Sequence, residues 1–149
     1  MGLCVLIDTN VLIDFISKRE PYFEDARIIV DTCDRHFYRG CIAAHSVPNI
    51  FYILRKSIPE TARREVLRKF CYIFEVVGID RKRLIDALDD QSFPDFEDCL
   101  QFRCAEVCHA DYIVTRNPKD FTQSTIPTIS PDTFRRRYLD TLLAGQEDE

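Results

Sequence analysis

The sequence lacks any apolar run near the ~20 residues that a membrane-spanning helix needs, so we expect no insertion into a bilayer. We also expect no signal peptide, and basic residues are not in excess. Glycine is scarce, with four residues in 149, and the apolar fraction of 46% is typical of a compact globular chain. The formal net charge of -5 excludes a basic coat protein for nucleic acid. Any nucleic acid must therefore be held locally, by a few basic side chains or through metal ions.

Cysteine, in contrast, is plentiful: there are seven, mostly within apolar patterns. Their odd number and the absence of a C-x-x-C pair favour reduced core thiols in a cytoplasmic protein. A less favoured alternative is a zinc site formed by Cys104, Cys108 and His109.

Short apolar runs alternate with helical patterns along the chain, which predicts a parallel sheet with helices on both faces. Strands are expected at residues 3–7, 41–44, 74–78 and 112–115, with a short edge strand at 128–129. Helices are expected at 10–17, 22–37, 46–56, 60–72, 80–88 and 95–109, and a last one is expected to begin at Ser130-Pro131. Gly40 is expected to end the second helix.

The length of 149 residues accommodates a single domain. We predict an α/β fold for residues 1–144, a three-layer α/β/α sandwich with a central parallel sheet of four to five strands. Residues 145–149 form an acidic segment that we expect to be a frayed tail.

The first strand ends in an acid. Leu3 to Ile7 is a continuous apolar run that suits a strand buried on both faces, and Asp8 follows it directly. Thr9 or Asn10 is expected to cap the next helix. Asp8 therefore belongs at the carboxyl end of a central strand, where open α/β sheets bind ligands. The alternative is that Asp8 only caps the helix.

The helix expected at 95–109 also begins with acids. Asp98 heads a line of apolar residues that continues through Phe102 and Ala105, and a carboxylate there is costly to bury without a cation. Asp95 lies one turn earlier and reaches toward the same place. The alternative is that acids in a first turn simply complement the helix dipole, which explains Asp95 and Glu97 better than Asp98.

These acids are expected to meet at one edge of the sheet. Asn117 and Asp120 follow the strand at 112–115, and parallel strands have their carboxyl ends on the same edge as Asp8. Ligands that offer only oxygen suit Mg²⁺ or Mn²⁺. Arg116 and Lys119 are candidates for flanking substrate phosphates, although surface charges of this kind are more often merely solvated.

Three segments together resemble the PIN domain family, over nearly the whole chain. They are the opening acidic strand at Leu6–Val11, the acid-led helix at Asp98–Ala105, and the closing strand and turn at Tyr112–Asn117 with Lys119–Phe121. The resemblance implies a metal-dependent ribonuclease that acts on RNA phosphodiesters, often the toxin of a VapC-like toxin–antitoxin pair. It also implies a homodimer and a small antitoxin protein as partner.

The resemblance assigns roles residue by residue. Asp8 and Asp98 would be primary metal ligands, with Asp95 and Asp120 binding directly or through water. Asn49 and Asn117 would orient waters, although many relatives carry acids at these places. Ser46 and Asn49 also fit a weak capping box, which explains Asn49 structurally. Thr9 and Thr115 would hydrogen-bond a ligand or phosphate.

Two other functions remain open at this point. The neutral Asn49 and Asn117 favour a PIN-like module that binds RNA or protein with weak catalysis or none. A third hypothesis is an interaction protein whose acidic corner receives an arginine from a partner, as an antitoxin would supply.

Overall fold

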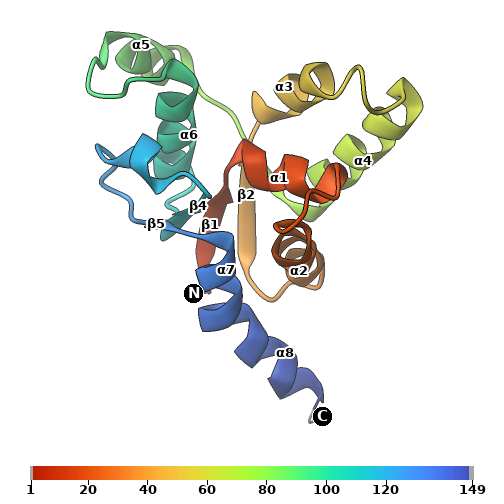
Figure 1. The fold of residues 1–149 in the computed structure, drawn as a ribbon. Helices are drawn as coiled ribbons and strands as arrows, with labels where there is room; N and C mark the ends of the chain where they lie inside the picture. The colour runs from red at the N-terminus through yellow and green to blue at the C-terminus, as the bar shows by residue number, and fades with distance from the viewer. Residues whose placement is uncertain (1, 148–149) are drawn as a thin grey trace.

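A computed structural model describes residues 2–147 and contains a five-stranded parallel sheet (Figure 1). In space the strands follow the order β3-β2-β1-β4-β5. Their bounds are β1 Cys4–Ile7, β2 Arg39–Ala43, β3 Glu75–Val77, β4 Tyr112–Val114 and β5 Thr128–Ile129. The five predicted strands are confirmed, including the short one at the edge.

Helices connect these strands. They are α1 Thr9–Ile16, α2 Phe23–Asp34, α3 Ser46–Ile53, α4 Glu60–Ile73, α5 Arg81–Asp89, α6 Phe96–Val107, α7 Pro131–Phe134 and α8 Asp140–Glu147. A 3₁₀ turn at Pro118–Phe121 follows β4, and a π-helical stretch at Arg135–Leu139 joins α7 to α8. Among the described residues, no helix is long and apolar enough to cross a membrane.

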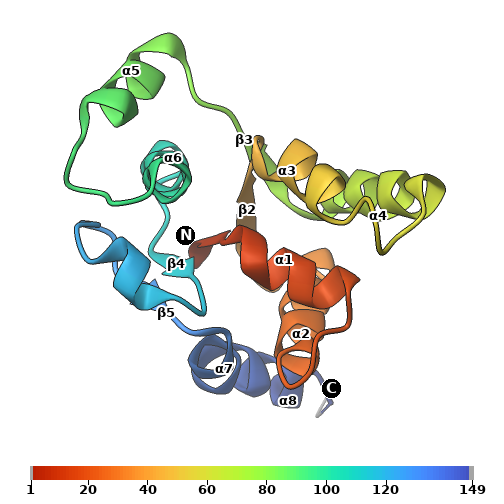
Figure 2. The same ribbon diagram turned by 45° about the horizontal axis from the view of Figure 1, so that its top comes forward.

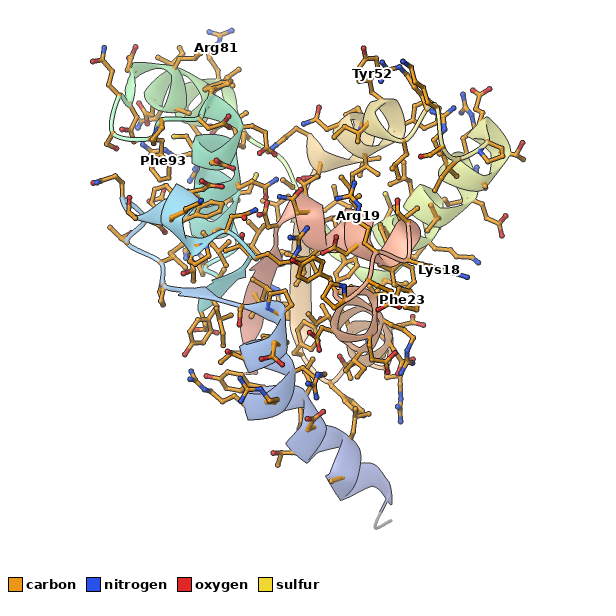
Figure 3. All side chains as sticks on the ribbon, viewed as in Figure 1. Lys18, Arg19, Phe23, Tyr52, Arg81 and Phe93 are labelled. Carbon is orange, nitrogen blue, oxygen red and sulfur yellow. The ribbon has the colours of Figure 1, made fainter. Side chains whose placement is uncertain are left out.

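The sheet is covered on both sides, which confirms the α/β/α sandwich. Figure 2 shows α5 and α6 on one side, with α1 to α4 on the other. Residues alternate along β1, so that Val5 and Ile7 pack beneath α1, α2 and α4 while Cys4 and Leu6 pack beneath α6. Burial on both faces explains the continuous apolar run of this strand. Phe93, labelled in Figure 3, extends the core between the sheet and α6 by stacking on Phe102, with 5.4 Å between ring centroids.

The strand order places a crevice at the end of β1. The chain adds β2 on one side of β1 and returns to add β4 on the other, so β1 and β4 are neighbours. The carboxyl ends at such a switch point are where open α/β sheets bind ligands. Asp8 follows β1 and Thr115 follows β4 at this place.

The boundaries of several elements differ from expectation. Asp8, not Thr9 or Asn10, is the N-cap of α1. Helix α3 ends at Ile53, before the predicted Arg55-Lys56. Helix α8 continues through Glu147, into the segment expected to be a frayed tail, while residues 148 and 149 lie outside the described part.

The prediction that Gly40 ends the second helix is wrong. Gly40 lies within β2. Helix α2 ends at Asp34, and His36 takes the left-handed conformation with a φ of 63°. Gly40 is required by a close approach instead. A Cβ atom there would lie 2.7 Å from Cys33 Sγ and 2.9 Å from Phe74 Cδ1.

We therefore expect Gly40→Ala to lower the free energy of unfolding by about 1–3 kcal/mol, the usual penalty for overpacking a core. Urea denaturation measures this loss. Gly78→Ala is the matched control, because nothing lies within 4 Å of a Cβ atom at position 78. Equal stability of the two variants would contradict the close-approach explanation.

Candidate metal centre

Asp8 is a buried carboxylate at the carboxyl end of β1. Its side chain accepts a hydrogen bond from the Thr115 hydroxyl at 2.8 Å and another from the Thr9 backbone N–H at 2.8 Å. Burial raises the pKa of Asp8 to about 6, although the Thr115 bond opposes the shift. The negative charges of Glu97 and Asp120 raise the pKa further. Asp8 therefore caps helix α1, as the alternative interpretation of the sequence expected, and it also faces other acids.

The first turn of α6 brings acids to the same place. Asp95 is the N-cap, and its Oδ1 accepts a hydrogen bond from the Asp98 backbone N–H at 3.0 Å. One oxygen from each of Asp95, Glu97 and Asp98 lies within 4.8 Å of the others. Burial raises the pKa of Asp98 to about 7, and the charges of the acids around it, Asp8 and Asp120 included, add to the shift. These carboxylates thus form one electrostatic cluster.

Glu97 belongs to this cluster, although the sequence offered no reason to separate it from an ordinary first-turn acid. Its Oε1 accepts a hydrogen bond from Gln101 Nε2 at 2.9 Å and lies 3.2 Å from His45 Nε2. Burial alone would raise the pKa of Glu97, but the hydrogen bonds from His45 and Gln101 outweigh it and lower the pKa. Glu97 is therefore held ionised beside Asp8.

Gln101 organises the polar groups beneath the acids. Its side chain is fully buried, and its Nε2 lies 2.9 Å from Thr9 Oγ1 and 2.8 Å from Ser46 Oγ. The two hydroxyls are 2.8 Å apart. This amide therefore links α6 to the starts of α1 and α3.

The sequence analysis did not identify Gln101 and His45, although each has a signal in the sequence. Gln101 is a polar residue in a largely apolar helix, four positions after Glu97. His45 follows the second strand at the edge where Asp8 was expected.

The structure brings together six of the residues singled out in the sequence: Asp8, Asp95, Asp98, Asp120, Thr9 and Thr115. Asn49 is exposed on α3, and Ser46 is the residue of that helix that contacts Thr9. The capping box is wrong, because the Ser46 hydroxyl bonds Thr9 and Gln101 while α3 has His45 as its N-cap. Asn117 lines a pocket with Tyr22 and Asp132, and its backbone N–H donates to Thr115 Oγ1 at 3.0 Å.

The two basic candidates lie in different surroundings. Arg116 forms two hydrogen bonds to the buried Asp14, at 2.7 and 3.2 Å, and its guanidinium lies 3.9 Å from the centroid of the Tyr22 ring. Arg116 is therefore engaged within the fold. Lys119 is exposed beside Asp120.

The donor set fits a hard divalent cation. All of its members are carboxylates, with hydroxyls and an amide around them, and such oxygens suit Mg²⁺ or Mn²⁺. The charged groups that shift the pKa values of Asp8 and Asp98 are all acids, and their repulsion is relieved when a cation binds. A cation would thus complete this charge arrangement.

The raised pKa values predict how stability depends on pH without metal. An aspartate with an unfolded pKa near 3.8 and a folded pKa of about 6 stabilises the fold only while protonated, so stability falls as pH rises through that interval. Between about pH 5 and about pH 8, Asp8 alone should account for a loss of about 1.4 kcal/mol. Asp98, with a pKa of about 7, adds a loss in the same direction.

Urea denaturation in EDTA at both pH values measures this change, and Mn²⁺ should reduce it at the higher pH. Stability that increases over the same interval without metal would contradict the assignment. Asp8→Asn should remove the Asp8 share.

Three comparisons place the chain among known proteins. A family model for the PIN domain matches residues 4–119. No curated protein sequence matches the chain at a significant level. Solved structures do match, including a toxin–antitoxin complex from Klebsiella pneumoniae, with a TM-score of 0.61 and 23% identity over 85% of this chain and 97% of that one.

Two further structures have the same fold. A DNA-bound VapBC from Salmonella typhimurium gives a TM-score of 0.64 and 22% identity, covering 87% of this chain and 98% of that one. VapC20 from Mycobacterium tuberculosis, described as a toxin that cleaves the sarcin-ricin loop, gives 0.63 and 11%, covering 82% and 95%. At these identities the structural likeness establishes the fold.

Proposed function

Because the chain belongs to the PIN domain family, we propose that it is an endoribonuclease that uses Mg²⁺ or Mn²⁺. One observation carries the proposal: Asp8 and Asp98, from segments far apart in the sequence, repel each other at the carboxyl end of the central strands. The neighbouring structures described as toxins support a more specific assignment, the toxin of a toxin–antitoxin pair.

We assign the ion to Asp8, Glu97 and Asp98, with Asp95 and Asp120 contributing directly or through water. When bound, such an ion activates water and stabilises the charge that develops on a phosphodiester. It also lets a protein with a net charge of -5 hold an anionic substrate at one point.

The chain's own residues fix the ligands in place. The Thr115 hydroxyl and the Thr9 backbone N–H orient the two oxygens of Asp8. Gln101 and His45 hold Glu97. Lys119 is exposed and directly precedes Asp120 in the sequence, and we assign it to a flanking phosphate.

Glu97 supplies the acid that position 49 lacks, and this assignment is testable. Glu97→Gln keeps the shape of the side chain and removes its charge, so we expect the Kd for Mn²⁺ to rise about tenfold or more, a loss of ~1.4 kcal/mol. Asn49→Ala is the matched control and should change the Kd by less than about twofold. Calorimetric titration measures both values. A large effect of Asn49→Ala with none of Glu97→Gln would reverse the two roles.

Cleavage of a mixed RNA pool tests the function itself. We expect cleavage with Mn²⁺, no cleavage with EDTA, and strongly reduced cleavage with Asp8→Asn. RNA binding without cleavage in Mn²⁺ would support the alternative, a catalytically weak or inactive RNA-binding module favoured by the exposed, neutral Asn49. Cleavage that persists in EDTA would indicate a contaminating nuclease and would count against the proposal.

The proposed partners are a small antitoxin and a second copy of the chain. A short open reading frame immediately upstream, whose product suppresses cleavage when the two are co-purified, would support the antitoxin. An arginine of that product placed at the acidic cluster would support the third hypothesis, that a partner occupies this site. Light scattering on the purified chain tests the homodimer.

A further inference from the structure

Three buried thiols meet on the α6 side of the sheet, away from the carboxylates. Cys4 begins β1, Cys41 lies within β2, and Cys108 follows the last residue of α6. Their sulfur atoms all lie within 4.8 Å of one another. Cys4 is separated from Asp8 by the length of β1, about 13 Å, and the acids lie at the opposite end of α6 from Cys108. We call these three residues the thiol cluster.

The spacing within the thiol cluster is that of metal ligands. Cys4 Sγ and Cys41 Sγ are 3.8 Å apart, much farther than the ~2.05 Å of a disulfide. Two sulfurs bound to one tetrahedral zinc at about 2.3 Å are separated by about 3.8 Å. The exposed fractions are 5% for Cys4, 0% for Cys41 and 3% for Cys108, so a bound ion would be shielded from water.

Cys108 is the thiol of this cluster that ionises most readily. Burial raises the pKa of Cys4, and hydrogen bonding to Cys108 together with burial raises the pKa of Cys41. Hydrogen bonds from the Cys41 and Cys4 thiols lower the pKa of Cys108 to about 7, against the effect of burial. The Arg39 guanidinium lowers it further, and Arg39 Nη1 donates to the Cys108 carbonyl oxygen at 3.4 Å. Arg39 is itself paired with Glu75 at 2.6 Å, so its charge is shared. A divalent ion therefore suits three thiolates better than a monovalent one, because it leaves one net negative charge instead of two.

We propose that Cys4, Cys41 and Cys108 bind one thiophilic divalent cation of the zinc type. Binding forms three metal–sulfur bonds and releases to solvent the thiol protons still present. The ion would tie β1 and β2 to the end of α6 and stabilise the fold by mass action.

The zinc site considered from the sequence used different partners. Cys104 Sγ donates to the Val77 carbonyl oxygen at 3.7 Å and lies outside the thiol cluster. His109 is exposed and takes a left-handed backbone conformation with a φ of 54°. Cys104 is therefore a matched control: it is as buried as Cys41, and it lies on the helix that Cys108 follows.

Titration of the full, reduced chain with Cd²⁺ alone tests the proposal, because Cd²⁺ bound to thiolates gives an ultraviolet sulfur-to-metal charge-transfer band that carboxylates do not give. All variants carry Cys71→Ser, because Cys71 is exposed and would bind Cd²⁺ between molecules. We expect a band that saturates at one equivalent, weakens when Zn²⁺ competes, and persists in Cys104→Ser and in Asp8→Asn.

Cys41→Ser and Cys108→Ser should each abolish the saturating step while keeping the wild-type circular dichroism. The Cys108 variant, at the end of a helix, keeps the test sharp if the Cys41 variant fails to fold. Absence of the band, its persistence in Cys108→Ser, or its loss in Cys104→Ser would overturn the proposal. Persistence of the band in Asp8→Asn separates this test from the fate of the nuclease assignment.

Discussion

Asp8→Asn is expected to reduce metal-dependent RNA cleavage by about 10²- to 10³-fold, the usual effect of removing one preorganised electrostatic group. The same variant should be more stable than the wild type without metal at neutral pH. The wild-type carboxylate, with a pKa of about 6, is ionised there although it is buried, at 4% exposure, among other acids. Removing this buried charge should raise the free energy of unfolding by up to about 3 kcal/mol, or the Tm by roughly 5–10 °C for a chain of this size.

Asparagine can keep both contacts of Asp8, because its amide oxygen accepts from Thr9 N–H and its NH₂ group can donate to Thr115 Oγ1. Cleavage rates in Mn²⁺ and melting curves in EDTA provide the two measurements. Asp86→Asn, at a half-buried acid on α5 that pairs with Lys82, is the control and should change neither. Loss of activity together with loss of stability would show that Asp8 only caps α1. Unchanged activity would remove Asp8 from the centre altogether.

The sequence predicted the fold and part of the site because local patterns carried both. The unbroken apolar run of residues 3–7 predicted a strand buried on both faces, and parallel geometry then placed Asp8 at a ligand-binding edge. Asp98 was identifiable because it interrupts an apolar line on its helix. Each of these inferences needs only periodicity and the direction of the chain.

The rest of the site depends on how α6 packs, which no local pattern encodes. Asp95 and Glu97 look like acids that complement a helix dipole, and only the packing of α6 turns Glu97 toward His45 and Gln101. The role of Gly40 was also predicted wrongly, because it depends on contacts between segments that are distant in the sequence. The demand for a small residue comes from Cys33 and Phe74, which reach it from α2 and the end of α4.

Arg116 shows most clearly that the function of a basic residue depends on its partner. Its position after the fourth strand made it a candidate for phosphate binding, but its guanidinium binds Asp14, 102 positions earlier in the chain. The Asp14 side chain is only 1% exposed, and Arg19, its second cation, is 4.0 Å away. Removing Arg116 therefore leaves a buried carboxylate with one distant partner, a change that usually costs about 3–5 kcal/mol.

Arg116→Met is accordingly expected to lower the free energy of unfolding by about 2–4 kcal/mol, reduced from the usual range by the remaining contact with Arg19. Urea denaturation measures this loss. Asp14→Leu/Arg116→Met replaces both charges with apolar groups and should recover most of the stability, because a buried ion pair seldom stabilises a fold more than well-packed apolar side chains of similar size.

If the double variant also cleaves RNA with the wild-type KM, Arg116 acts only by holding α1 to the segment after β4. A raised KM in a variant of restored stability would instead show that Arg116 contacts a substrate phosphate. If the double variant does not regain stability, the ion pair between Asp14 and Arg116 contributes more to the free energy of unfolding than apolar side chains can replace.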